Sequence, residues 1–430
     1  MSNFKNHKFS ELGCHYGGLS NKRKEDFGYG KPYISYLNIF ENVFVDSSKM
    51  DYVNISGGEH QNKVKKGDIF FTTSSETAEE VGMTSVLLDD LGETYLNSFC
   101  FGFRLNDFKV LLPEYAGFLF RSEGVRKRIS SLAQGSTRYN LSKTIFFDKL
   151  YLDLPSMSFQ RKIAQILTTV DKVIERTENA IEKLKKIKQG MTHDLFTRGI
   201  DVKTGKLRPS YSEVPELYKE TELGWIPKGW SPKTFSDICV INQGLQIAIS
   251  NRYKHEGNNR FVYITIQYLN DPENGSNRFY IEDPATSVIC YEDDILMTRT
   301  GNTGIVVSNI VGVFHNNFFK IKYQKDNQKD FIIYYLERPE IQTMILNYAG
   351  TTTIPDLKHD DFYRLPYPQP EKLEQEEIVR TIKSIDVKID TEIIYFEKAK
   401  KLQNGLMQDL LTGKVEVTPD PQDKEYQEVS

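Results

Sequence analysis

The sequence predicts an α+β protein in which two pseudo-symmetric, mixed α/β globules are separated by two long helices that form an antiparallel coiled coil. Three observations lead to this prediction: a long internal repeat, a heptad pattern of apolar residues within each copy, and short β-branched and aromatic runs before each heptad pattern. The chain has 430 residues, which is enough for two globules that each bury a core of their own.

The internal repeat runs without a gap from Gly135–Thr197 to Gly350–Thr412, at a constant offset of 215 residues. Two long copies indicate a pseudo-symmetric protein rather than a solenoid, which needs three or more short units. Upstream of the gap-free part the correspondence is fainter. Identical pairs include Gly135/Gly350, Gln160/Gln375, Asp171/Asp386, Lys186/Lys401 and Gly190/Gly405.

Within each copy the apolar residues step by alternating fours and threes, which is the a/d seam of a coiled coil. Polar residues interrupt both seams at equivalent places, Thr177 with Glu392 and Lys188 with Gln403. One such stripe also suits a helix that lies on its own globule, but two stripes of equal length favour mutual pairing. The apolar seam residues are Ile163, Leu167, Val170, Ile174, Ile181 and Leu184 in the first copy, and Ile378, Ile382, Ile385, Ile389, Phe396 and Leu406 in the second.

Each heptad pattern follows a region that looks mixed α/β. Runs such as Asp68–Thr72 and Tyr263–Ile266 have the residue types of strands, and Tyr115–Phe120 and Phe331–Leu336 look like helices packed on sheets. Prolines precede both long helices, and a stretch rich in glycine, proline and mixed charge follows the first. The predicted parts are a globule at 1–155, a helix at 156–199, a linker at 200–222, a second globule at 223–370, a second helix at 371–413 and a flexible tail at 414–430.

Composition points to a globular protein of the cytoplasm without a membrane partner. Hydrophobic residues make up 39% of the chain, yet no apolar run approaches the roughly 18 residues of a membrane span. Cys14, Cys100, Cys239 and Cys290 stand alone, which fits neither a zinc site nor a disulfide framework. The net charge of −4 argues against nonspecific coating of nucleic acid and leaves sequence-specific reading open.

The sequence contains no recognisable catalytic motif. The glycine-containing stretch Thr300–Gly304 lacks the lysine and spacing of a phosphate-binding P-loop. There is no Asn-Pro-Pro-aromatic motif of amino-methyltransferases, no Gly-x-Ser-x-Gly elbow and no His-Glu-x-x-His helix. We therefore expect a chain that is not an enzyme and carries no metal or cofactor of its own.

These features together resemble the specificity subunit of type I restriction-modification systems. Each globule closes with a Gly-Ser/Thr-Thr segment and a Leu-x-x-x-x-Pro exit, and each helix ends in Gly-x-x-x-Asp-Leu. The junction Glu222–Trp230, which opens the second globule, is also typical of this family. The resemblance covers essentially the whole chain.

The resemblance implies that each globule is a target recognition domain that reads one half of a bipartite site in double-stranded DNA. The paired helices would space the two halves and dock two methyltransferase subunits, which carry S-adenosylmethionine. Two restriction subunits could join them, with ATP and Mg²⁺ as their cofactors. At 1.5 Å per residue, a helix of 39 residues from Phe159 to Thr197 spans roughly 58 Å. An antiparallel pair of such helices sends the globules to opposite ends, from which they could meet one face of the DNA about one helical turn apart.

Candidate DNA contacts lie on loops at strand ends and before the exits to the helices, where a rigid scaffold can present polar side chains. Arginine can read guanine, asparagine can read adenine, and hydroxyl groups hold phosphates. The glycines of the two Gly-Ser/Thr-Thr segments could equally be turns that only orient the helices. The candidates are Thr73, Ser74, Ser75, Arg138 and Tyr139 in the first copy, and Arg299, Thr300, Asn302, Thr303, Thr351 and Thr352 in the second.

Two other functions remain open from the sequence. One is a protein-bridging scaffold that grips two copies of a protein and does not bind DNA. The other is a nuclease or methyltransferase whose active site has no recognisable motif.

Overall fold

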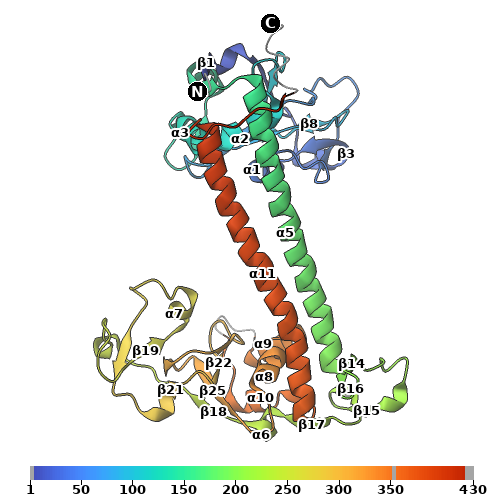
Figure 1. The fold of residues 1–430 in the computed structure, drawn as a ribbon, viewed down its shortest axis with the longest axis vertical. Coiled ribbons are helices and arrows are strands. Elements are labelled where there is room, and N and C mark those ends of the chain that lie inside the picture. The colour runs from blue at the N-terminus through green and yellow to red at the C-terminus, as the bar shows by residue number, and fades with distance from the viewer. Residues whose placement is uncertain (1–3, 351–354, 422–430) are drawn as a thin grey trace. The chain divides into compact units, whose positions relative to one another are not determined.

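The computed structural model describes residues 4–350 and 355–421, which belong to two compact units (Figure 1). The first unit consists of Met1–Asn179 and Ile393–Ser430, and the second is Ala180–Glu392. Each unit therefore contains one globule and one end of each long helix.

The two long helices are α5 (Met157–Thr197) and α11 (Lys372–Leu411), as the heptad pattern predicts. The seam positions of each helix, the polar ones included, are buried or half-buried. Large apolar side chains off the seam, such as Ile187 and Leu402, stay exposed. The seam is therefore the face that each helix shields from solvent.

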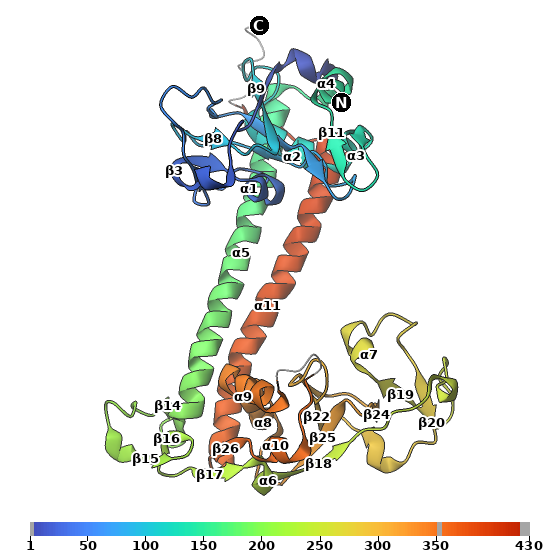
Figure 2. The ribbon, with the colours of Figure 1, turned by 180° about the vertical axis from the view of Figure 1, so that it is seen from behind.

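Within each unit the helices lie side by side and run in opposite directions (Figures 1 and 2). In the first unit, Leu167 near the start of α5 shares a core with Leu410 at the end of α11. In the second unit, Leu195 at the end of α5 shares a core with Ile378 near the start of α11. The pairing is therefore antiparallel, as predicted.

The first globule is built on an antiparallel four-stranded sheet in the order β2-β9-β5-β7. Its central strand β5 is buried at all four residues, because helices α1 and α2 both pack over β5 and β7. A smaller sheet, β4-β3-β8, contains a parallel pair, and strand β12 leads into α5 after pairing with β1. The bounds are β1 Lys5–Lys8, β2 Gly13–Gly17, β3 Phe27–Ile34, α1 Tyr36–Glu41, β4 Asp51–Val53, β5 Ile69–Thr72, β6 Ser74–Ser75, β7 Thr84–Val86, β8 Tyr95–Leu96, β9 Cys100–Leu105, α2 Pro113–Arg121, α3 Glu123–Ser130, β10 Ala133–Gln134, β11 Tyr139–Leu141, α4 Lys143–Lys149 and β12 Tyr151–Leu154.

The second globule has the same plan. Its antiparallel sheet has the order β18-β25-β22-β23, its second sheet β20-β19-β24-β21 again contains a parallel pair, and strand β26 leads into α11 after pairing with β17. The bounds are β17 Ser231–Thr234, α6 Phe235–Ile238, β18 Cys239–Gln243, β19 Arg260–Ile264, α7 Ile266–Asn270, β20 Tyr280–Glu282, β21 Ile289–Cys290, β22 Ile295–Thr298, β23 Val306–Ser308, β24 Gly312–Phe314, β25 Phe318–Tyr323, α8 Lys329–Leu336, α9 Pro339–Ala349, α10 His359–Tyr363 and β26 Pro366–Gln369.

Individual hydrogen bonds of the first globule also have equivalents in the second globule. The amide of Phe9 donates to the carbonyl of Leu150 at 2.9 Å, and the amide of Phe235 donates to Leu365 at the same distance. Both phenylalanines are fully buried at the centre of an aromatic cluster. The two globules are thus two copies of one fold, as the repeat predicts.

A repeated glutamine fastens the start of each long helix to its globule. The buried Gln160 side chain accepts a hydrogen bond from the Leu112 amide at 2.9 Å and donates to the carbonyls of Val110 and Pro155 at 2.7 and 2.9 Å. Gln375 makes the same three contacts, with the Gln328 amide at 2.9 Å and the carbonyls of Asp326 and Pro370. The two copies therefore share a glutamine at this position because it makes the same three contacts in both.

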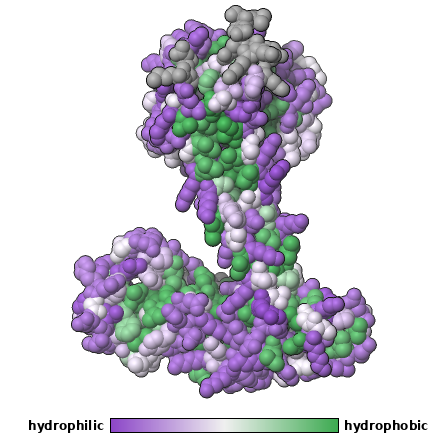
Figure 3. Space-filling view, in the orientation of Figure 1, coloured by the Kyte–Doolittle hydropathy of each residue, from purple (hydrophilic) through white to green (hydrophobic). Residues whose placement is uncertain are grey.

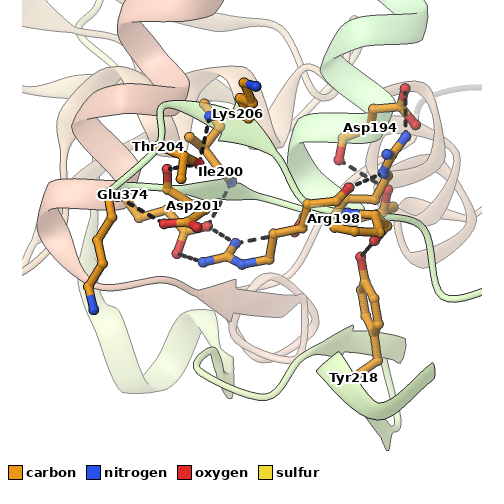
Figure 4. Close-up of polar contacts among 12 residues, drawn as sticks. Asp194, Arg198, Ile200, Asp201, Thr204, Lys206, Tyr218 and Glu374 are labelled. Carbon is orange, nitrogen blue, oxygen red and sulfur yellow. Dashed lines mark hydrogen bonds and ion pairs between the residues drawn. The ribbon is translucent and has the colours of Figure 1, made fainter. Parts of the chain in front are cut away.

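Residues 200–222, which the sequence marks as a linker, contribute to two short hairpins of the second unit, β13 (Ile200–Asp201) with β14 (Lys206–Leu207) and β15 (Tyr218–Thr221) with β16 (Gly224–Pro227). Arg208 from this segment forms a bidentate ion pair with the buried Glu374 at the start of α11, and Glu374 also accepts from the Ile200 amide at 3.0 Å (Figure 4). Gly199 has a φ of 67°, which favours glycine, and a Cβ there would lie 2.2 Å from the Glu374 carboxylate and disturb this ion pair. The end of α5 is thereby tied to the start of α11.

Described residues of the C-terminal segment that the sequence marks as a tail contact the first unit. Val417 packs against the main hydrophobic core of that unit. Asp420 forms an ion pair with Lys162 on α5, at 2.8 Å. The segment up to Pro421 therefore adds contacts beside the end of α11.

Replacing Gln160 with alanine should lower the free energy of unfolding by about 2–4 kcal/mol, because one amide and two carbonyls lose their buried partner. Urea unfolding of the full chain measures this change. The matched control is Gln165→Ala, at an exposed position of the same helix, which should stay within about 0.5 kcal/mol of the parent. Equal loss in both variants would contradict the role given to Gln160.

Candidate nucleic-acid interface

The structure brings the predicted residues of the first copy together, although they lie more than sixty residues apart in the sequence. Strand β11 pairs with β6, so that Tyr139 lies opposite Ser75 and Asn140 opposite Ser74. The Thr73 carbonyl accepts from the Leu141 amide at 2.9 Å. These side chains therefore share one small sheet beside the end of β5.

This small sheet forms part of the wall of an open pocket of about 820 Å³ in the first unit. Arg138 lies at the pocket and donates to the Ser74 hydroxyl at 3.0 Å, and its guanidinium has no carboxylate partner among the described residues. Ser75 donates to Glu80 at 3.0 Å. The other lining residues are Tyr36, Leu37, Phe40, Glu76, Phe99 and Thr137.

The aromatic side of this pocket was not predicted from the sequence. The Tyr36 and Phe40 rings are stacked with centroids 5.9 Å apart, and Phe99 is 56% exposed. Burial raises the pKa of Tyr36, so its phenol stays protonated and donates to the Ser74 carbonyl at 3.0 Å. No pattern in the sequence links Tyr36, Phe40 and Phe99, which come together only in the fold. A pocket with an arginine, a carboxylate and stacked rings can bind the edge and the face of a base.

Thr73 has a structural role in this arrangement. Both its amide and its hydroxyl donate to the Phe99 carbonyl, at 2.9 and 2.7 Å. Its hydroxyl is therefore engaged within the chain, and Thr73 holds the loop that carries Phe99.

In the second copy, Arg299 and Thr300 are both bound to Asp356. The Arg299 guanidinium contacts the two Asp356 oxygens at 2.8 Å each and lies over the Phe319 ring, and its side chain is only 13% exposed. The Thr300 hydroxyl donates to the same carboxylate at 2.6 Å. This ion pair closes the loop after β22, so the arginine reaches no outside base while the pair stays intact.

The remaining candidates of the second copy divide into a buried and an exposed residue. Thr303 is buried, and its hydroxyl lies 3.0 Å from the Arg299 carbonyl. The side chain of Asn302 is exposed and has no hydrogen bond to the described part of the chain. Thr351 and Thr352 lie outside the described residues. Asn302 is thus the predicted residue that this loop offers to a ligand.

The two interfaces share their scaffold and differ in their side chains. The buried Thr72 and Thr298 hydroxyls accept equivalent amide hydrogen bonds, from Met83 at 3.0 Å and Ile305 at 2.9 Å. The Arg299 carbonyl accepts from the Leu357 amide at 2.9 Å, which matches the Thr73 contact of the first copy. One backbone frame therefore presents two different polar surfaces.

Gly135 and Gly350, the glycines that repeat upstream of the two long helices, have different structural surroundings. Gly135 turns the chain between β10 and β11 with a φ of 134°, and a Cβ there would lie 2.1 Å from the Arg138 carbonyl. Gly350 ends α9 with a φ of 83°. Both are turn residues, which favours the structural interpretation of these two glycines.

Polar pairs across the helix seam fix its register. In the first unit, Gln403 donates to Asp171, and in the second unit Lys188 forms an ion pair with Asp386 at 2.5 Å. Asp386 also accepts from the Tyr334 phenol at 2.6 Å. Lys188 and Gln403 therefore each meet the repeated aspartate of the other helix, and a slip of the helices would bury these groups without partners.

The residues that the structure describes contain neither a disulfide nor a cluster of metal-ligating side chains. All four cysteines are free thiols. Residues 4–350 and 355–421 hold no group of three or more histidine, cysteine or carboxylate side chains suited to a metal ion. Within the same ranges, no helix has both the length and the apolar character required to cross a membrane.

The sequence matches the family described as the type I restriction modification DNA specificity domain, over residues 1–186 and 227–395. The type I restriction enzyme MjaIX specificity subunit of Methanocaldococcus jannaschii is 25% identical over 442 residues, which cover 95% of this chain and 93% of that protein. The fold is similar to the crystal structure of a type I restriction-modification system S subunit from M. genitalium, with a TM-score of 0.56, 16% identity and 97% of both chains covered. A structure concerned with complex assembly and conformational transition of the type I R-M system gives a TM-score of 0.55 at 14% identity, covering 95% of this chain and 97% of that one.

We expect the stability of the protein to depend on pH through Asp171, which pairs with Gln403 across the seam of the first unit. Burial raises the pKa of Asp171 to about 6, with Arg121 opposing the shift. A carboxyl whose pKa is higher in the folded state binds its proton more tightly there, so stability falls as the pH rises from about 4 to about 6. Asp171→Asn should match the parent below pH 4 and exceed it by about 1–2 kcal/mol above pH 7, since partial exposure reduces the effect.

Urea unfolding between pH 4 and pH 7 measures this difference. A stability difference for Asp171→Asn that does not change with pH would contradict the assignment.

Proposed function

The chain belongs to the family of type I restriction modification DNA specificity domains, and we propose that it reads the two halves of a bipartite target in double-stranded DNA, one half with each globule. The observation that carries this proposal is the shared backbone frame with different polar side chains. A pair of readers for two unlike half-sites needs a common scaffold and independent specificity. The chain contributes recognition in this proposal and leaves the chemistry to its partners.

In the first globule, we assign base reading to residues of the pocket that Arg138 and Glu80 line. Arg138 is exposed and free of carboxylates among the described residues, and bidentate contacts to guanine suit its guanidinium. Glu80 accepts from the Ser75 and Thr77 hydroxyls on one carboxylate oxygen, and its other oxygen can accept from the amino group of cytosine. Ser74, Ser75 and Tyr139 lie next to these groups, where hydroxyl groups can hold phosphates.

In the second globule we assign base reading to Asn302, which suits adenine, and give Arg299, Thr300 and Thr303 the role of holding the loop. This changes the assignment that the sequence suggests for Arg299. Asp356 binds Arg299 and Thr300 of the loop after β22. If Arg299 left it to contact a base, the Asp356 carboxylate would stay unpaired near the negatively charged DNA phosphates. Thr351 and Thr352 remain candidates on sequence grounds.

The helices act as the spacer between the two reading units and as the platform for two methyltransferase subunits. An uninterrupted helix of 41 residues is about 61 Å long. S-adenosylmethionine belongs to those methyltransferase subunits, and ATP and Mg²⁺ to two restriction subunits where these join the complex in the cytoplasm. Neither requires a site in this chain.

The direct test is a binding assay with duplex DNA whose sequence is taken from the methylated sites of a host that carries the gene. The complex with modification subunits should bind this duplex at least 1,000-fold more tightly than a scrambled duplex at the same salt concentration. A scaffold that bridges proteins without contacting DNA would show no preference at any salt concentration. Methyl transfer by the chain alone would instead identify it as an enzyme.

Side-chain substitutions should separate the two half-sites. Arg138→Ala should weaken binding by about 1–3 kcal/mol and relax the preference at one position of one half-site, while Asn302→Ala does the same in the other half. Methylome sequencing of hosts with each variant records both halves at once. Arg176→Ala, an exposed arginine on α5, is the control and should change neither half. If either variant altered both halves, the globules would not read independently.

A further inference from the structure

One surface position of the first globule is apolar where the equivalent position of the second globule is polar. Phe99 lies in the turn between β8 and β9, and Asn317 lies in the corresponding turn between β24 and β25. The same backbone hydrogen bond holds both turns. The Phe99 carbonyl accepts from the Thr73 amide at 2.9 Å, and the Asn317 carbonyl accepts from the Arg299 amide at 2.7 Å. The two side chains therefore start from the same place on a shared frame.

A second pair of equivalent positions differs in the same way. Leu37 is the second residue of α1, and Gln267 is the second residue of α7. Each of these helices begins after a hydroxyl side chain, Ser35 or Thr265, that accepts a hydrogen bond from the amide of the third helical residue. The first globule therefore presents two apolar side chains where the second globule presents two amides.

Leu37 and Phe99 both line the open pocket of the first unit that also contains Arg138. Leu37 is 61% exposed and Phe99 is 56% exposed. Apolar residues reach the surface elsewhere too, as the green areas of Figure 3 show, so exposure alone does not distinguish this pair. Phe99 is distinguished by its fixed backbone, because its amide donates to the Asn97 side chain at 2.8 Å and its carbonyl accepts from both the amide and the hydroxyl of Thr73. The chain thus holds an exposed ring in place at the wall of the pocket.

We propose that Phe99 and Leu37 form an apolar corner of the pocket that receives the 5-methyl group of a thymine in the first half-site. This methyl group is the apolar group that a base pair presents in the major groove, and phenylalanine is one of the side chains that contact it. Arg138 and Glu80 line the same pocket and suit guanine and cytosine. The corner adds thymine to the bases that this pocket distinguishes.

An apolar side chain can also enter DNA as a wedge between stacked bases, but a wedge has to project from the protein surface. Leu37 and Phe99 line a hollow, so here the DNA group has to project into the protein. A methyl group on the edge of a base does so, whereas the faces of the bases lie within the stack. The concave surroundings therefore favour contact with the methyl group.

This inference rests on the proposed function, under which the first globule reads one half-site, and it names one of the bases that this globule reads. The second globule carries Gln267 and Asn317 at the equivalent positions, and amide side chains suit adenine. One frame thus serves two base preferences, because the side chains on it differ.

The test removes the methyl group alone. Each thymine of the methylated target, on either strand, is replaced in turn with uracil, which pairs in the same way and lacks the 5-methyl group. Titration at one salt concentration measures how tightly the complex with modification subunits binds each duplex. At one thymine the parent complex should bind the uracil duplex about fourfold more weakly, which is the effect of losing one buried methyl group.

The effect of this replacement should depend on Phe99. The complex with Phe99→Ala should bind the original target more weakly than the parent does and should bind the thymine and uracil duplexes equally well. Phe99→Asn, which places the side chain of the second copy on the first frame, should also lose the preference for thymine. Phe99 is exposed, so both free variants should unfold close to the parent temperature.

Phe108→Ala is the matched control. Phe108 belongs to the same unit, is 43% exposed and follows the opposite end of β9, away from the pocket. The complex with this variant should keep the fourfold preference of the parent for thymine.

Other outcomes overturn the inference in distinguishable ways. If no uracil replacement weakens binding, or if Phe99→Ala keeps the preference for thymine, the apolar corner does not hold the methyl group and the proposed function still stands. A loss of affinity in Phe99→Ala without any methyl preference in the parent would assign the ring to stacking on bases. A parent complex that binds the target no more tightly than a scrambled duplex would contradict the proposed function and this inference together.

Discussion

The structure depends on one constraint, the fixed antiparallel register of α5 and α11. Two polar pairs set it, Asp171 with Gln403 in the first unit and Lys188 with Asp386 in the second. Positions 171 and 188 are 17 residues apart, and so are 386 and 403. Both pairs therefore describe the same register, with equal lengths of helix between them. An apolar seam alone would tolerate a slip by one heptad, whereas these pairs would then lose their partners.

The same two kinds of contact, strand pairing and the hydrogen bonds of a buried glutamine, join each globule to the start of one long helix. An exit strand pairs with the first strand of its globule, and a buried glutamine binds three backbone groups across the junction. These contacts use residues that the two copies share. The loops that follow β5 and β22 rest on shared backbone bonds but carry different side chains. Support and the proposed DNA reading thus use different residues, so the loops can differ between the copies without disturbing the helices.

The sequence was sufficient to predict the features that repeat or have a period. The seam residues, the polar interruptions at Lys188 and Gln403, and the two equivalent globules were all visible because each leaves a pattern. Interactions between distant, unpatterned positions were not visible. Arg299 looked like a DNA contact because nothing in the sequence marks Asp356, 57 residues away, as its partner. The pocket beside Arg138 was missed for the same reason, since Tyr36 and Phe99 reach it only through the fold.

The central claim is that the helix pair sets the spacing of the two half-sites, and shortening both helices tests it most directly. Deleting Thr177–Lys183 and Glu392–Lys398 removes one heptad from each helix between the two polar pairs, so both pairs keep their register. Each helix becomes about 10 Å shorter, or roughly three base pairs. Methylome sequencing of a host with the shortened chain should show both half-sites unchanged and the gap between them reduced by about three base pairs. Methylation at the original gap would contradict the account.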